Sequence, residues 1–165
     1  MNFIDLTAIP NTGIAIVVDG GCTNNNLPEN TRALYGSFAV FKDGKRVEKI
    51  THYEQVFEHQ YRWEANMPQW HEAFPGIPAT NNVAECEMMA QALSYAIRIS
   101  KQYKNIAFLC DSQVVESYTK PDTKFNKDAR HLKEWHEAIS SRFQANAGFT
   151  FTHLDNKIVK GILGH

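Results

Sequence analysis

Short apolar runs separated by polar turns predict that strands come first along this chain. Residues 13–21, GIAIVVDGG, are rich in β-branched residues and predict a buried strand. Residues 34–41 predict a second strand, which stops at the turn Asp43-Gly44, and residues 47–57 resume the extended pattern. We therefore expect the sheet to begin as an antiparallel meander of three strands.

Helical periodicity begins after residue 80. From Asn82 to Ser100 the apolar positions recur every three or four residues, which predicts an amphipathic helix with Glu85 in its first turn. Residues 105–110 predict another strand, and residues 112–118 a short helix that begins near Ser112.

A longer helix and a last strand follow. The helix carries Leu132, Trp135, Ile139 and Phe143 on one face, and the strand covers residues 149–154. His131 and His136 fall on the polar face of that helix, where we expect them at the surface. The complete order is three strands, a helix, a strand, two helices and a strand, which indicates an α/β layered domain.

The pattern predicts one domain over residues 1–165, since a chain of 165 residues is of ordinary single-domain length. Residues 1–12 are expected to form an N-terminal extension. Residues 58–80 contain Trp63, Trp70 and Phe74 among polar residues and predict a long loop. The tail from Asp155 onward has no clear period.

The composition is typical of a soluble globular protein and not of a membrane protein. The chain is 43% hydrophobic and 21% charged, with no apolar run close to the roughly 20 residues that span a bilayer. It begins with no secretory signal pattern, so we expect a cytoplasmic protein without a membrane partner, and a monomer. Three cysteines without CxxC spacing favour neither a disulfide framework nor a zinc site.

Two acidic residues stand at the ends of predicted strands. Asp19 and Asp111 each follow an apolar run, and the reactive crevice of an α/β sheet lies beyond the strand ends. Glu85 could join them from its helix. A cluster of carboxylates supplies the oxygen ligands that suit Mg²⁺ or Mn²⁺ and so suggests phosphoryl chemistry. The alternative for each aspartate is a helix cap.

Three segments resemble one family. VVDGGCTNN, TNNVAECEMMAQAL and FLCDSQVV are similar, in that order, to the first-strand, first-helix and fourth-strand signatures of type 1 ribonuclease H. The resemblance runs from about Gly13 to the end of the chain. It implies a ribonuclease H-like fold, with a five-stranded mixed sheet flanked by helices.

The resemblance also implies an activity, the hydrolysis of the RNA strand of an RNA·DNA hybrid by metal-ion catalysis. Asp19, Glu85 and Asp111 match three acidic positions of the family and would hold two Mg²⁺ (or Mn²⁺) ions. No serine nucleophile is implied, and Ser112 is interpreted as a helix-start hydroxyl.

Further positions match those at which the family contacts its hybrid. They are Cys22, Asn25, Asn81 and Asn82, whose small polar groups would reach 2′-hydroxyls in the minor groove. Turn formation and helix capping are the alternative roles for the asparagines, and Thr80 could also cap the helix.

Because the formal net charge is −1, any surface that binds nucleic acid must be a local patch. The best candidate is a basic cluster, for which a solvated helix face is the alternative interpretation. It comprises Lys120, Lys124, Lys127, Arg130 and Lys133.

The family's fourth aspartate has no evident counterpart, and two alignments of the tail are open. In the first, which we favour, Gly164-His165 match the family's glycine-histidine loop, and His165 shuttles a proton at the rim of the site. Lys160 then points away from the carboxylates. In the second, residues 156–160 stand for the last helix, and Lys160 takes the fourth acidic position.

Two other functions compete with an active ribonuclease. One is a catalytically silent ribonuclease H-like module that binds nucleic acid or a protein. The other is a structure-selective DNA nuclease of the same fold, against which the TNN element favours hybrid recognition.

Overall fold

The computed structural model describes residues 13–24, 27–28, 31–42, 45–50, 72, 74–125 and 127–163. The strands are β1 (Ile14–Thr23), β2 (Ala33–Lys42), β3 (Lys45–Ile50), β4 (Ile106–Cys110) and β5 (Phe149–His153). The α-helices are α4 (Asn81–Ile99), α5 (Gln113–Tyr118), α6 (Lys133–Ala145) and α7 (Asn156–Leu163), and a 3-10 helix covers Lys127–Leu132.

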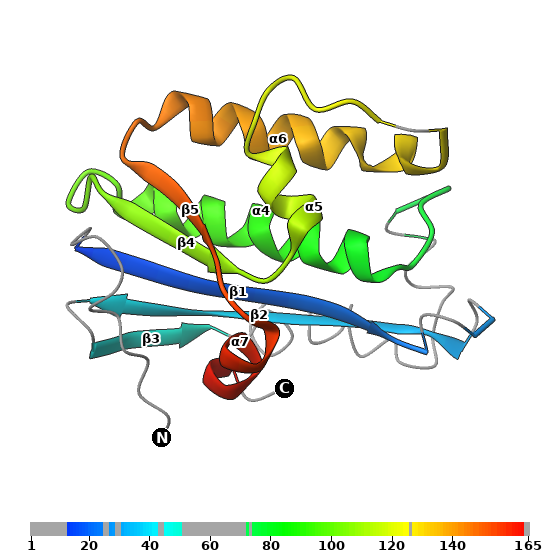
Figure 1. Cartoon of the computed structure of the whole chain (residues 1–165), viewed down its shortest axis with the longest axis horizontal. Helices are drawn as coiled ribbons and strands as arrows, with labels where there is room; N and C mark the ends of the chain where they lie inside the picture. Colours follow the sequence, from blue (N-terminus) through cyan, green and yellow to red (C-terminus); the bar gives the residue numbers. More distant parts are fainter. Residues whose placement is uncertain are drawn as a thin grey trace.

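The strands form one mixed sheet in the order β3-β2-β1-β4-β5. β1 pairs antiparallel with β2 and parallel with β4, and β4 pairs parallel with β5. Helices α4 and α6 lie on one side of this sheet and α7 on the other (Figure 1). The expected α/β class, with an antiparallel start and flanking helices, is therefore confirmed.

The two faces of the sheet have separate cores because successive side chains of a strand point to opposite sides. Ile14, Ile16 and Val18 of β1 pack in the large core with α4 and α6. Ala15 and Val17 face the other way, where they pack with Val159 and Leu163 of α7. Asp19, the sixth of the ten residues of β1, continues this second row.

Close packing of α4 on the sheet requires glycine in the neighbouring strands. A Cβ atom on Gly20 would overlap the carbonyl oxygen of Ala84 and lie 2.9 Å from the backbone nitrogen of Glu85. A Cβ atom on Gly36 of β2 would overlap the Met88 side chain. The missing side chains let the first turns of α4 approach the backbone of β1.

Several boundaries differ from the sequence-based expectation. Thr80 caps α4 by accepting from the Val83 amide at 3.2 Å, so the helix begins one residue earlier than predicted and Glu85 lies just beyond its first turn. His136 is buried rather than at the surface: its Nε2 lies 2.8 Å from the Lys120 carbonyl oxygen, and its ring packs against Tyr118. The short helix α5 begins after Ser112, which caps it as expected.

The long loop falls largely outside the described residues, including Trp63 and Trp70, as does the N-terminal extension. Phe74, near the end of the loop, packs against Trp135 with ring centroids 5.9 Å apart. All three cysteines are buried free thiols. No helix in the described part of the chain combines the length and the apolar character needed to cross a membrane.

Gly20→Ala should destabilise the fold, because the added methyl group meets backbone atoms that cannot rotate away. We expect a loss of about 1–3 kcal/mol in the free energy of unfolding, measured by chemical denaturation. Gly161→Ala is the control, since this glycine is exposed on α7 and alanine favours a helix. Equal stability of the two variants would contradict the close approach.

Candidate active site

The register of β1 and β4 brings two carboxylates side by side. Ile14 pairs with Ile106, and Val17 pairs with Leu109. The same offset, continued two residues along both chains, places Asp19 next to Asp111. Both follow residues of the small core on the α7 side of the sheet, so both side chains lie on that side.

Glu85 approaches this pair from α4. The contact between Gly20 and the backbone of α4 holds the start of that helix against β1, one residue beyond Asp19. The Ser112 hydroxyl, which accepts from the Val115 amide at 3.1 Å, is also hydrogen-bonded to the Glu85 carboxylate. One residue therefore caps α5 and orients Glu85.

Burial and mutual repulsion disfavour ionisation of the carboxylates. Burial, and then the charges of Asp111 and Glu85, raise the pKa of Asp19 from 3.8 to about 7. The pKa of Glu85 is likewise raised from 4.5 to about 7, chiefly by burial. The Ser112 hydrogen bond lowers this pKa and the charge of Asp111 raises it, and both effects are smaller than that of burial. We call Asp19, Glu85 and Asp111 the carboxylate cluster, a group of acids that an added cation would stabilise.

Helix α7 borders the cluster, contrary to the alignment of the tail that we favoured. Residues 156–163 are helical, not extended, and the Asn156 amide donates to a carboxylate oxygen of Asp111. The charge of Lys160 lowers the pKa of Asp19 and is the smallest of the effects on that pKa, so the direction in which the Lys160 side chain points stays a prediction. His165 lies outside the described residues, and its role as a proton shuttle stays a prediction.

The oxygens of the carboxylate cluster suit a hard cation, but the three side chains are not arranged as a complete set of metal ligands. Carboxylate oxygens are the preferred ligands of Mg²⁺ and Mn²⁺. Within the part of the chain that the structure describes, no three acidic, histidine or cysteine side chains are grouped so that they could hold a metal ion. Metal binding by the carboxylate cluster therefore stays a prediction.

The residues predicted to contact an RNA·DNA hybrid differ from one another in burial and in hydrogen bonding. The Cys22 thiol is buried, 3.9 Å from the Ala79 carbonyl oxygen, so its side chain is not available to a sugar. Asn81 accepts from the Cys22 amide at 2.7 Å and joins the end of β1 to the start of α4, while Asn82 is exposed. Neither asparagine is the helix cap, and Asn25 lies outside the described residues.

The basic cluster is exposed where its side chains are described. Lys124 lies in the loop that follows α5, and Arg130 lies in the 3-10 helix before α6. Lys120 and Lys133 are exposed as well. The side chain of Lys127 is outside the described set. The residues are therefore spread over a loop and two helices and not along one helix face.

Three residues at the cluster were missed by sequence reasoning. The His153 Nε2 lies 3.1 Å from the Asp111 carbonyl oxygen, at the end of β5. The Tyr35 ring, opposite Gly21 in the sheet, covers the place of the missing Gly21 side chain, and the pKa of Tyr35 is raised by burial and then by Asp19. Asn156 belonged to the second alignment of the tail, in which residues 156–160 stand for the last helix, but it was not predicted as a site residue.

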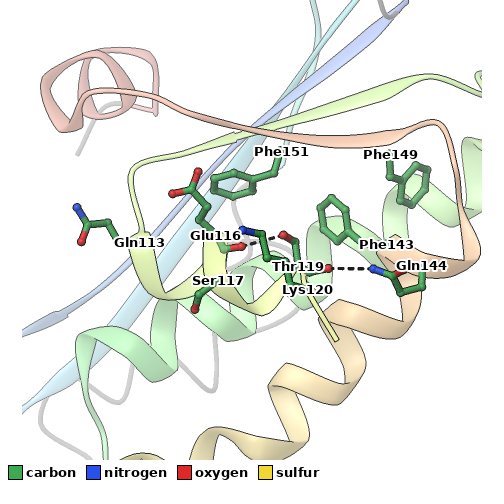
Figure 2. Close-up of a pocket in the computed structure, with 9 residues that line it drawn as sticks. All are labelled: Gln113, Glu116, Ser117, Thr119, Lys120, Phe143, Gln144, Phe149 and Phe151. Carbon is green, nitrogen blue, oxygen red and sulfur yellow. Dashed lines mark hydrogen bonds between the residues drawn. The ribbon is translucent and has the colours of Figure 1, made fainter. Parts of the chain in front are cut away.

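A separate cavity of about 450 Å³ lies between α5, α6 and β5. Figure 2 shows Phe143, Phe149 and Phe151 along one side, with the α5 residues opposite them. The side chain of Gln144, one of the lining residues, donates to the Thr119 carbonyl oxygen at 3.3 Å (Figure 2). None of the carboxylate cluster lines this cavity, so it is not part of the candidate active site.

Comparison with solved structures identifies the fold. The chain superimposes on RNase H1 from the archaeon Halobacterium salinarum with a TM-score of 0.58 and 18% identity, covering 89% of each chain. LC11-RNase H1, isolated from compost by a metagenomic approach and solved with an RNA/DNA hybrid, gives a TM-score of 0.60 and 17% identity, covering 88% of this chain and 87% of that one. The RNase H domain of PFV gives 0.58 and 15%, covering 90% and 82%.

The sequence matches no protein-family model and no curated protein. Structural likeness at this level of identity establishes the ribonuclease H fold, and the resemblance seen in the sequence is confirmed to that extent. Because one fold can host many functions, the reaction depends on the residues of the site.

The raised pKa values predict how stability depends on pH in the absence of metal. Asp19 and Glu85 titrate near pH 4 when unfolded and near pH 7 when folded, so the native state holds more protons between these values. The free energy of unfolding should therefore be highest below about pH 4 and fall by on the order of 2–4 kcal/mol as the pH rises to about 7. Denaturation in chelator, with Asp19→Asn for comparison, measures this slope, and an equal slope in both proteins would refute the assignment.

Proposed function

We propose that this protein is a nuclease that hydrolyses the RNA strand of RNA·DNA hybrids with a divalent cation. The observation that carries the proposal is the carboxylate cluster, in which acids from β1, α4 and the end of β4 interact on a ribonuclease H fold. Similarity to a structure solved with an RNA/DNA hybrid supports the choice of substrate.

In this proposal Asp19 and Asp111 are metal ligands on the sheet, and Glu85 is a third ligand from α4. A bound Mg²⁺ or Mn²⁺ would supply an activated water and stabilise the leaving oxygen of the phosphodiester. The protein contributes the positions of the carboxylates: Ser112 orients Glu85, and Asn156 orients Asp111. No protein nucleophile is required.

Recognition of the hybrid would combine sugar and phosphate contacts. Asn82 is exposed beside the site and is suited to a 2′-hydroxyl, which distinguishes RNA from DNA. Lys124 and Arg130 are exposed cations suited to the phosphate backbone. Asn25 and Lys127 complete the proposed contact surface.

A second candidate function is hybrid binding without cleavage. Two observations favour it: a lysine acts on Asp19, and the described acids are not grouped to hold a metal ion. Both functions share the same binding surface, so the decisive experiment is a cleavage assay. Labelled RNA·DNA hybrid, with RNA and DNA duplexes as controls, is incubated in Mg²⁺, in Mn²⁺ and in chelator. Cleavage of the DNA duplex alone would identify a DNA nuclease instead.

Asp19→Asn should reduce hybrid cleavage by ~100- to 1000-fold, because the amide removes a charged ligand from the cluster. The fold should be retained, since the substitution also removes a repulsive charge. Asp122→Asn is the control, because Asp122 is exposed in the loop after α5. Rates are compared under single-turnover conditions, and cleavage by Asp19→Asn at the parental rate would refute the assignment.

The basic residues should govern how hybrid binding responds to salt. Lys124→Glu with Arg130→Glu should weaken binding, and each lost phosphate contact should reduce the slope of log K against log salt by about one. Lys101→Glu with Lys104→Glu, at the far end of α4, makes the same change in net charge as a control. If both double variants bind equally well at low salt, the basic cluster is only a solvated surface.

A further inference from the structure

The side chain of His136 connects helix α6 to the segment that follows α5. Its Nε2 lies 2.8 Å from the Lys120 carbonyl oxygen. A carbonyl oxygen only accepts hydrogen bonds, so Nε2 carries a hydrogen and donates it. His136 is 6% exposed, and its side chain therefore belongs to the interior of the fold.

The same ring also contacts the far end of this segment. Tyr118 of α5, Phe125 and His136 form a cluster of three rings, in which each pair of centroids lies 5.2 or 5.3 Å apart. Phe125 in turn packs against the large core. We call residues 119–125 the basic loop. His136 contacts it near its beginning, at Lys120, and at its end, at Phe125.

Further hydrogen bonds tie the basic loop to the two helices. The Thr123 hydroxyl donates to the Ser117 carbonyl oxygen at 2.6 Å. The Gln144 side chain of α6 donates to the Thr119 carbonyl oxygen at 3.3 Å. The last carbonyl groups of a helix have no partner within the helix, and side-chain donors satisfy them here. The conformation of the loop is therefore determined by both α5 and α6.

The basic loop carries two members of the basic cluster. Lys120, whose carbonyl group His136 binds, and Lys124, which directly precedes Phe125, both have exposed side chains. A loop that moved freely would have to be ordered when its lysines contacted phosphates, and that ordering would reduce affinity. Holding the backbone at both lysines removes part of this cost before binding.

We propose that His136 is a positioning residue for nucleic-acid binding, which holds the basic loop so that Lys120 and Lys124 contact the phosphate backbone of the hybrid. The inference rests on the proposed function and deepens it, because it names a residue outside the carboxylate cluster that determines affinity. His136 is buried and does not itself contact the hybrid. It acts through the backbone of Lys120 and the ring of Phe125.

His136→Phe tests the proposal, because it keeps a ring in the cluster of three and removes the donor to Lys120. Its affinity for labelled hybrid at low salt should fall by about 2- to 10-fold, the range that one hydrogen bond supplies. The slope of log K against log salt should also become smaller. His136→Gln retains a donor and should recover part of the loss. Equal affinity of the parent and His136→Phe would overturn the proposal.

Trp135→Phe is the matched control on the same helix. The Trp135 indole donates to the Glu87 carboxylate at 2.9 Å, so this variant also loses a buried hydrogen bond of α6, but one directed to α4. It should lower the free energy of unfolding and leave both the hybrid affinity and the salt slope as in the parent. An equal loss of affinity in the two variants would mean that His136 acts only through stability, against the proposal.

A double-mutant cycle tests whether His136 acts through the two lysines. In a protein that carries Lys120→Gln and Lys124→Gln, adding His136→Phe should cause no further loss of hybrid affinity, because the cations that it positions are absent. A further loss as large as the one in the parent would contradict the proposed role.

Hydrogen exchange in the free protein separates this inference from the function on which it rests. Amides of the basic loop should exchange faster in His136→Phe than in the parent or in Trp135→Phe. Faster exchange with unchanged hybrid affinity would overturn the role of His136 and leave the proposed function intact. A parent that binds no hybrid would refute the proposed function, and the positioning role would fall with it.

Discussion

Burial of carboxylates beside one another is the constraint on which the candidate site depends. The fold brings together Asp19 in the middle of β1, Asp111 just after β4 and Glu85 of α4. Burial, and then mutual charge, raise the pKa of Asp19 and Glu85 to about 7. Such an arrangement costs stability at neutral pH and persists because the surrounding structure imposes it. A cluster of this kind is a common mark of a functional site.

The two cores of the sheet impose the arrangement from opposite sides. On one side the large core holds α4 against β1, where Gly20 allows backbone contact and Glu85 enters the site. On the other side the small core holds α7, whose polar face meets Asp111. The acids are therefore carried by elements that the hydrophobic cores fix, and none depends on a mobile loop for its position.

The fold of this chain resembles that of the solved RNase H structures, but the similarity of fold does not settle the chemistry of the candidate site. The solved RNase H structures match nearly the whole chain at 15–18% identity, which establishes the architecture. At the site, the charge of Lys160 lowers the pKa of Asp19, opposite in direction to the effects of Asp111 and Glu85. The fold by itself is compatible with cleavage of a hybrid and with binding alone, because function resides in the site and not in the fold.

The sequence by itself determined the parts that depend on local pattern. The apolar runs predicted the strands, the period of three to four residues predicted α4 and α6, and the acids at the strand ends indicated where chemistry would lie, because these signals are encoded within a few residues. The tail could not be determined in this way. Residues 156–163 are helical because Val159 and Leu163 have a sheet face to cover, and eight residues alone would rarely form a stable helix. The position of Lys160, the burial of His136 and the bond from Asn156 to Asp111 were likewise decided by contacts between segments far apart in the sequence.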